Sequence, residues 1–274
     1  MKSGWWMGPA FTALLSPLLL GGCQSVQTTQ AGTVGVERKQ NMLVSSEQIN
    51  DSAVKAYQQV LQEAAAKGQL NRDPQQVARI RAIASRLIPN TGAFRPDGPG
   101  WKWEVNVISS NQVNAWCMPG GKIAVYSGIL TKLNLTDDEA AAVMGHEMAH
   151  ALREHSREQV SQKMEQGIAV GVIGAALGLG GLAQDLSRMV LDVTFNLPNS
   201  RTAETEADRI GVELAARAGY DPRAAVALWQ KMSKLAGSEP PKWLSTHPEN
   251  SARLKDLEVY AERVQPLYVA AKKK

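Results

Sequence analysis

The chain has few cysteines, few aromatic residues and little net charge. Its 274 residues include two cysteines, and the aromatic residues together make up 5%. Two cysteines exclude a disulfide-rich scaffold, so a hydrophobic core has to hold the fold together. The 30 basic and 26 acidic residues leave a net charge of +4, part of which comes from three lysines at the C-terminus. Because no basic stripe interleaved with aromatic residues accompanies this small excess, the composition argues against a nucleic-acid partner.

The N-terminus has the pattern of an export signal. Lys2 precedes a short apolar run over residues 8–20, and Gly21 and Gly22 come directly before Cys23. A positive start, a short apolar run and small residues are typical of a secretory signal peptide, and the run is too short for a membrane span. This end also resembles the lipobox of bacterial lipoproteins, which implies cleavage before Cys23 and lipid attachment to it. The alternative is an ordinary signal peptide with a chance cysteine.

A lipid on Cys23 would hold the chain to a membrane leaflet without spanning it. Gln24 follows the cysteine where an aspartate would retain the protein at the inner membrane, so we expect the outer membrane of a bacterial envelope, with the chain facing the periplasm. Cys117 then has no partner within the chain, and we expect it to be a small buried hydrophobic residue.

The rest of the chain divides by composition. With 44% hydrophobic and 20% charged residues, it is expected to fold. Residues 1–22 are the predicted signal, and residues 23–45, rich in Gln, Thr, Ser and Gly, are a predicted flexible tether. We expect one folded domain over residues 46–264 and a basic tail over residues 265–274.

Local patterns predict a mainly helical α+β domain. Helical spacing of apolar residues predicts a helix over residues 46–66, and Asp73-Pro74 begins another that ends near residue 88. Strict alternation predicts a half-buried strand over residues 101–107. Residues 113–117 and 122–126 flank a Pro-Gly-Gly turn and are expected to pair as a hairpin.

A metal-binding motif lies in the next predicted helix. A capping box over residues 136–139 (T-D-D-E) begins that helix, and from here on the pattern is almost entirely helical. His146 and His150 in H-E-M-A-H lie one turn apart on the same face, so both imidazoles can reach one metal ion. Glu147 lies between them, in reach of a metal-bound water. This is the H-E-x-x-H arrangement of zinc peptidases.

A catalytic zinc site needs a third protein ligand. In one known continuation of the H-E-x-x-H motif, a glycine lies three residues after the second histidine and a third histidine lies six residues after it. This chain has Arg153 and Ser156 there, and His155 misses the position by one residue. We therefore disfavour that continuation and expect His155 to be a solvated helix side chain.

The other continuation places a glutamate on a later helix. Residues 200–208 (S-R-T-A-E-T-E-A-D) open such a helix. Glu204 and Asp208 share one face of it, so Glu204 can bind zinc while Asp208 accepts a hydrogen bond from a ligand histidine. Glu206 points elsewhere and is expected to be exposed.

Four motifs together resemble the HtpX and CAAX-prenyl-protease-like zinc metallopeptidases, which are gluzincins. They are H-E-M-A-H, S-R-T-A-E-T-E-A-D, T-H-P-E-N-S-A-R-L and N-A-W-C-M-P-G-G, and the likeness covers about residues 50–260. Within the family, the lipid-anchored LoiP-like and BepA-like bacterial envelope members are most similar. The resemblance implies a zincin-like fold with a small sheet beside the metal helix, and one Zn²⁺ per chain held by His146, His150 and Glu204.

The resemblance also implies catalytic roles. Glu147 would take a proton from water and deliver it to the leaving amine. Asp208 would contact a metal-binding residue without binding the metal itself, and His247 would lie near the reacting carbonyl. His247 is the best candidate donor to the oxyanion, but it can instead occupy the fourth zinc position and block the water. Arg253 would tether that loop or bind a substrate carboxylate.

Two further segments bear on substrate binding. A strand around Asn114 and Ala115 can pair with an extended peptide by strand addition, although a plain core hairpin is the alternative. Residues 167–183 lack charge, but a single membrane crossing would separate His150 from Glu204. We therefore expect a glycine-rich cover beside the cleft, continuing to about residue 198, or shallow insertion into the leaflet.

These features favour a zinc endopeptidase that hydrolyses unfolded or misassembled envelope proteins. The second candidate is a periplasmic chaperone or assembly factor for outer-membrane proteins with latent peptidase activity. A third is a structural zinc lipoprotein. Glu147 favours the enzyme over a binder, and the absence of cysteine ligands argues against a purely structural zinc site.

Overall fold

The computed structural model describes residues 24–171, 182–235, 241–248 and 251–273. The strands are β1 (Gln24–Val26), β2 (Gln40–Met42), β3 (Glu104–Ile108), β4 (Ala115–Met118) and β5 (Lys122–Tyr126). The helices are α1 (Ser46–Ala66), α2 (Pro74–Leu87), α3 (Ser127–Lys132), α4 (Asp137–Leu152), α5 (His155–Gly171), α6 (Leu182–Phe195), α7 (Arg201–Arg217), α8 (Ala224–Leu235), α9 (Lys242–Thr246) and α10 (Ser251–Ala271). Two short 3₁₀ helices, η1 (Ile88–Ala93) and η2 (Gly98–Gly100), follow α2.

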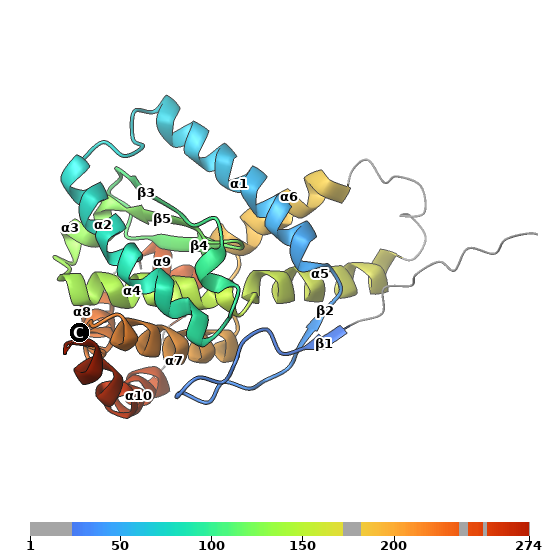
Figure 1. The fold of residues 1–274 in the computed structure, drawn as a ribbon. Coiled ribbons are helices and arrows are strands. Elements are labelled where there is room, and N and C mark those ends of the chain that lie inside the picture. The colour runs from blue at the N-terminus through green and yellow to red at the C-terminus, as the bar shows by residue number, and fades with distance from the viewer. Residues whose placement is uncertain (1–23, 172–181, 236–240, 249–250, 274) are drawn as a thin grey trace, which may run out of the picture.

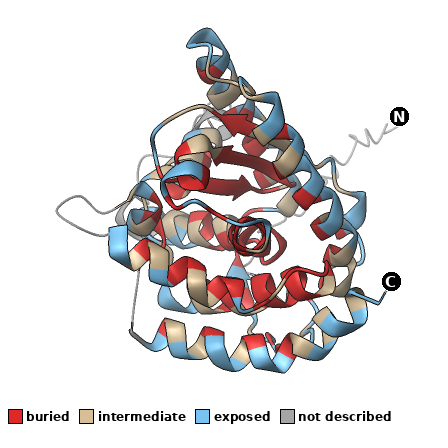
Figure 2. Ribbon diagram, turned by 90° about the vertical axis from the view of Figure 1, so that its left-hand side faces the viewer, coloured by how far each residue is buried: buried red, intermediate tan, exposed pale blue. Residues whose placement is uncertain are grey.

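A three-stranded sheet lies against the long helix α4. Its strand order is β3-β5-β4, with β3 parallel and β4 antiparallel to β5, so β4 is an edge strand. Figure 1 shows α1 above the sheet and α4 beneath it, followed by α7 and then α10. In Figure 2 most of the three-stranded sheet is buried, apart from the start of β3, whereas the outer helices alternate between buried and exposed residues. The prediction of a mainly helical α+β fold, with a small sheet beside the H-E-x-x-H helix, is confirmed.

Local signals in the sequence begin the main helices. Thr136 caps α4 by accepting a hydrogen bond from the Glu139 amide, and the Glu139 carboxylate accepts one from the Thr136 amide. The Asp73 side chain caps α2 by accepting from the Gln75 and Gln76 amides, with proline in the first turn. Each cap satisfies amide groups that the first helical turn leaves without partners. The β4–β5 hairpin turns through Gly120 and Gly121, both at positive φ (74° and 80°).

Two glycines allow α4 and α7 to pack in direct backbone contact. A Cβ added at Gly145 would lie 2.8 Å from the Gly211 carbonyl oxygen, and one added at Gly211 would lie 2.7 Å from the His146 amide nitrogen. Only glycine permits so close an approach. The contact brings the N-terminal half of α7 beside the H-E-x-x-H motif.

The predicted tether is wrong for residues 24–45, because this segment packs on the domain. Val34, Val36 and Met42 are buried, and Gln40 is fully buried. The Gln40 amide donates to the carbonyl oxygen of Arg153 and to Glu158, so its polar atoms are satisfied inside the fold. The predicted tail is also wrong in its boundary, since α10 continues through residue 271.

Other predictions fall wholly or partly outside the described residues. These are the signal over residues 1–22, lipidation of Cys23, and most of the predicted cover over residues 167–183. Among the residues that the structure describes, none of the helices is long and apolar enough to cross a membrane.

Candidate metal centre

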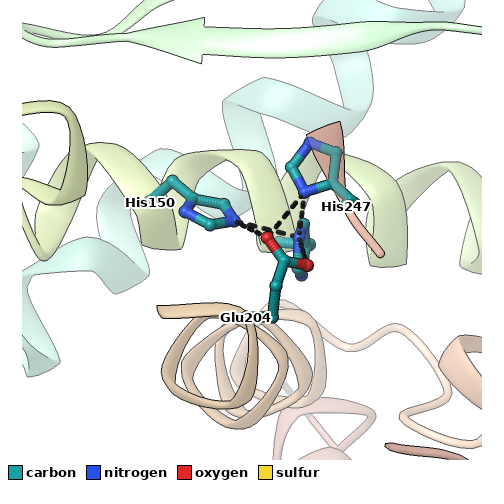
Figure 3. A group of neighbouring side chains, drawn as sticks. His150, Glu204 and His247 are labelled. Carbon is teal, nitrogen blue, oxygen red and sulfur yellow. Dashed lines mark hydrogen bonds and ion pairs between the residues drawn. The ribbon is translucent and has the colours of Figure 1, made fainter. Parts of the chain in front are cut away.

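Four buried side chains from three parts of the chain converge at one point. His146 and His150 come from α4, Glu204 from the first turn of α7, and His247 directly follows α9. One ligand atom from each lies within 4.8 Å of the others. Figure 3 shows Glu204 reaching from α7 toward His150 and His247. The structure thus brings together the three residues expected to bind metal and adds His247 to them.

The distances between these atoms have the size of a zinc coordination shell. His146 Nε2 lies 3.1 Å from His150 Nε2 and 3.2 Å from His247 Nδ1. Glu204 Oε1 lies 3.3 Å from His150 Nε2 and 2.9 Å from His247 Nδ1. Tetrahedral ligands at about 2.0–2.1 Å from zinc lie about 3.4 Å from one another. Four of the six distances among these donor atoms are thus close to those of a tetrahedral zinc site.

The Nδ1 atoms of His146 and His150, which point away from the centre, also have partners that suit metal binding. His146 Nδ1 lies 3.0 Å from the Asp208 carboxylate, and His150 Nδ1 lies 2.9 Å from the ring of His155. A carboxylate at Nδ1 keeps the proton on that nitrogen, so Nε2 presents a lone pair. If His150 has the same tautomer, two lone pairs face each other at the centre. A cation between them turns this repulsion into attraction.

The charges of the site suit metal binding. Burial lowers the pKa of His150 well below its usual range, although Glu204 opposes the shift. Burial by itself raises the pKa of Glu204, but the charge of the nearby His247 and the contacts of Glu204 with His150 and His247 lower it well below its usual range. For His247, burial by itself lowers the pKa, but the negative charges of Glu204 and Glu147 raise it overall. A neutral His150 and an ionised Glu204 are the forms that bind metal.

Arg253 supports the centre and does not face a substrate. It is 5% exposed, and its guanidinium contacts both oxygens of Asp208 and lies 2.7 Å from Glu204 Oε2. Burial raises the pKa of Asp208, but Arg253 and His146 lower it overall. The prediction that Arg253 binds a substrate carboxylate is wrong for this conformation, because its donors are already paired. The alternative, a tether for the loop, agrees with its bond of 3.3 Å to the Pro248 carbonyl oxygen.

Trp243 is a site residue that the sequence analysis missed. Its indole Nε1 donates to Glu147 Oε1 at 2.7 Å, and its ring stacks on His247 with 4.7 Å between centroids. Both Trp243 and Glu147 are buried. Trp243 lies 96 residues from Glu147, and a lone tryptophan on a one-turn helix carries no pattern that would reveal the contact.

His155 and Glu206 were both expected to face solvent, and both expectations are wrong. His155 is 3% exposed and Glu206 is 6% exposed. His155 Nε2 lies 3.0 Å from Glu206 Oε2, which also accepts bonds from Arg153. Burial raises the pKa of Glu206, but the bonds from His155 and Arg38 outweigh burial and lower it to about 2.

A narrow cleft reaches the centre beside the edge strand β4. Its lining includes Cys117, which is buried as expected, and burial raises the pKa of that thiol. Asn114 and Ala115, the predicted substrate contacts, are buried and lie outside the lining. The Asn114 side chain accepts from the Ala115 amide. The cleft is lined by Trp116, Cys117, Glu147, His150, Ser156, Val193, Thr194, Asn199, Thr246 and His247.

Comparison with known proteins finds a family match. Residues 74–261 match the family described as "Peptidase family M48", which covers more than half of the chain. The match contains the four converging residues and both α4 and α7, which carry three of them.

Curated relatives agree with this match. The chain is 40% identical over 158 residues to the mitochondrial metalloendopeptidase OMA1 of Arabidopsis thaliana, covering 58% of this chain and 31% of that protein. It is 37% identical over 166 residues to the protein of the same name in Schizosaccharomyces pombe, covering 60% and 48%. It is 27% identical over 211 residues to the beta-barrel assembly-enhancing protease of Escherichia coli, covering 72% and 41%. The chain thus spans between about a third and a half of the length of these relatives.

Proposed function

The chain belongs to peptidase family M48, and from this premise we propose that it is a zinc-dependent endopeptidase. The observation that carries the proposal is the convergence of three imidazole nitrogens and one carboxylate oxygen within 4.8 Å, with Glu147 alongside. Two helix histidines and a glutamate within this set are the donors typical of zinc peptidases, and the set contains no thiolate.

The proposed zinc ligands are His146 Nε2, His150 Nε2 and Glu204, with one ion per chain. Bound zinc supplies a Lewis acid that activates water and polarises the scissile carbonyl. Glu147 is the proposed general base, which takes a proton from water and returns it to the leaving amine. The Trp243 indole holds this carboxylate from one side. Asp208 and Arg253 hold His146 and Glu204 in orientation.

We propose unfolded or misassembled proteins of a bacterial envelope as substrates. The narrow cleft beside β4 suits an extended chain better than a folded one. The name of the Escherichia coli relative refers to β-barrel assembly, whereas the relatives named OMA1 are mitochondrial, so the names alone leave the compartment open. The signal and the Cys23 lipobox favour lipid anchoring at the outer membrane, facing the periplasm. They also favour the LoiP-like and BepA-like members of the HtpX-like group.

A periplasmic chaperone or assembly factor with latent peptidase activity is the second candidate. The position of His247 Nδ1, 3.2 Å from His146 Nε2, favours it. A histidine there occupies the fourth coordination position that a catalytic zinc otherwise leaves open. The same contact is compatible with the enzyme if substrate binding displaces His247.

The test compares the wild type with Glu147→Gln, using zinc content and cleavage of an unfolded protein such as casein. We expect both proteins to hold one zinc and the variant to lose about 10²–10⁴-fold in cleavage rate, because the carboxamide cannot accept the proton. Glu258→Gln, on the exposed face of α10, is the matched control. Equal cleavage by wild type and Glu147→Gln would remove Glu147 as the base. Zinc binding and client binding without cleavage by either would favour the chaperone.

A further inference from the structure

A chain of buried polar contacts leads away from the centre on the side of His150. His150 Nδ1 lies 2.9 Å from His155 Nδ1, and His155 Nε2 lies 3.0 Å from Glu206 Oε2. All three side chains are buried, with exposures of 6%, 3% and 6%. None of these contacts involves Glu147, Asp208 or Arg253, so this is a second support, separate from the one behind His146.

The direction of these hydrogen bonds follows from the chemistry of the two ends. The Glu206 carboxylate accepts from Arg153 and Arg38, so His155 Nε2 is the donor to it and His155 Nδ1 is left with a lone pair. That lone pair accepts from His150 Nδ1–H, which leaves His150 Nε2 unprotonated toward Glu204 and His146. We propose that His155 and Glu206 are positioning residues that fix the tautomer and ring orientation of His150 for metal binding. This inference rests on the proposed zinc site.

The far end of the contact chain is held by two arginines. Arg153 donates to Glu206 Oε2 from Nε at 3.1 Å and from Nη2 at 3.0 Å. Arg38 donates to Glu206 Oε1 at 2.7 Å and also to Glu158. Arg38 belongs to the N-terminal segment that packs on the domain, and its backbone carbonyl accepts from Arg153. The N-terminal segment therefore closes the network that orients His150.

Such supports behind a metal-binding histidine are typically worth about 10–100-fold in metal affinity. Without such a support the histidine ring is not held in place before the ion binds. Ordering the ring on binding then lowers the metal affinity. An unsupported His150 can rotate or shift its proton to Nε2, and either change removes a ligand. The expected loss is thus in zinc affinity first and in catalytic rate second.

The test uses the full chain with three substitutions in the network. His155→Leu removes both ring nitrogens, His155→Gln keeps one acceptor and one donor, and Glu206→Gln removes the charge that sets the direction. Zinc dissociation constants are measured by competition with a chromophoric chelator, and unfolding of the zinc-free proteins is measured in urea. Thr91→Ala is the matched control, because Thr91 is fully buried and its hydroxyl donates to the Ile88 carbonyl oxygen, outside the network that orients His150.

We expect His155→Leu to weaken zinc binding about 10–100-fold, and Glu206→Gln to weaken it by a smaller factor. His155→Gln should restore most of the affinity, and Thr91→Ala should lower stability without changing affinity. Cleavage by zinc-loaded His155→Leu should show a reduced kcat with an unchanged KM. Should His155→Leu be obtained only unfolded, Glu206→Gln decides the question.

Two negative results have different meanings. If the wild type binds zinc but His155→Leu and Glu206→Gln bind it equally tightly, the positioning role is wrong and the proposed zinc site stands. If the wild type itself binds no zinc with purified, folded protein, the proposed function and this inference both fail.

Discussion

His247 makes the clearest prediction for a single residue. Its Nδ1 lies 3.2 Å from His146 Nε2 and 2.9 Å from Glu204 Oε1, in the position of a fourth ligand. We therefore predict that His247→Ala keeps one zinc and cleaves an unfolded protein faster than the wild type, because the position opens to water. Zinc content and initial cleavage rates at several substrate concentrations check this. A fall in kcat with zinc retained would instead identify His247 as the donor to the oxyanion.

At the scale of residues, sequence spacing predicted those contacts that depend on helix geometry alone. His146 and His150 share a face in any straight helix, and Glu204 shares one with Asp208. His155 was misjudged because the helix was taken to continue past it. In the structure α4 ends at residue 152, the chain turns at Glu154 with φ of 53°, and α5 then begins at His155. This turn rotates the His155 ring back toward His150.

The error at Glu206 has a different cause. Glu206 lies on the opposite face of α7 from Glu204, which is why it was expected to meet solvent. That face is covered by the N-terminal segment through Arg38. No local pattern in residues 200–208 reports which distant segment will cover them, so the burial of Glu206 could not be predicted there.

At the scale of elements, the glycine contact between α4 and α7 sets the geometry of the metal centre. We predict that Gly211→Ala destabilises the protein by about 1–3 kcal/mol, because the new Cβ would lie 2.7 Å from a backbone atom of α4. Separating the helices also moves Glu204 away from both imidazoles, so zinc binding should weaken. Urea unfolding with and without zinc measures both effects.

Gly167→Ala is the control for that prediction. Gly167 lies in α5, and a Cβ there would meet nothing within 4 Å. Alanine should leave stability unchanged or raise it by up to about 1 kcal/mol through helix propensity. If Gly211→Ala were as stable as Gly167→Ala and bound zinc equally well, close packing of the two helices would not be what positions Glu204.

Most elements could be predicted because their signals are local. The capping residues of α2 and α4, the hairpin turn and the long helices all follow from patterns within a few neighbouring residues. The parallel pairing of β3 with β5 could not be predicted, since it joins Glu104 to Lys122 across the hairpin and depends on tertiary packing. Because β5 pairs with both β3 and β4, β4 lies at the edge of the sheet. The sequence offered an edge strand only as one of two alternatives, the other being a plain core hairpin.

At the scale of the whole molecule, Glu154 ties two distant segments, at Ser46 and at Arg95, to the start of α5. Its carboxylate accepts from Arg95 at 2.6 Å, from Arg157 at 2.6 Å and from the Ser46 hydroxyl at 3.0 Å. Burial raises the pKa of Glu154, but the bonds from Arg157 and Arg95 lower it overall. A carboxyl group whose pKa is lower in the folded state contributes stability above its unfolded pKa, and this contribution disappears as the pH falls through the folded pKa.

We therefore predict that Glu154→Gln lowers the free energy of unfolding by about 2 kcal/mol at pH 7. The difference from the wild type should shrink below about pH 4, as the wild-type carboxyl group becomes protonated. Urea unfolding of both proteins between pH 3 and pH 7 measures it, with Glu258→Gln as the exposed control. A difference that is constant over this range would show that the ion pairs contribute nothing and that only shape matters.

The N-terminal segment shows that composition alone can give a wrong prediction of whether a segment packs on the domain. Residues 24–45 are rich in Gln and Thr and contain two glycines, which is a composition that a tether can have. Their few apolar residues, such as Val34 and Met42, are nevertheless buried, and their polar side chains find partners on α5 and α7. A segment with few apolar residues can still pack when a buried charge such as Glu206 needs a partner.

The metal centre joins parts of the chain that lie far apart in the sequence. Arg38 reaches its supporting contacts from the N-terminal segment, and His247 and Arg253 reach it from residues that follow α9. A fragment that stops before residue 247 therefore carries the H-E-x-x-H helix without these last two side chains. Tight capture of an ion is accordingly expected of the assembled tertiary structure and not of the isolated motif.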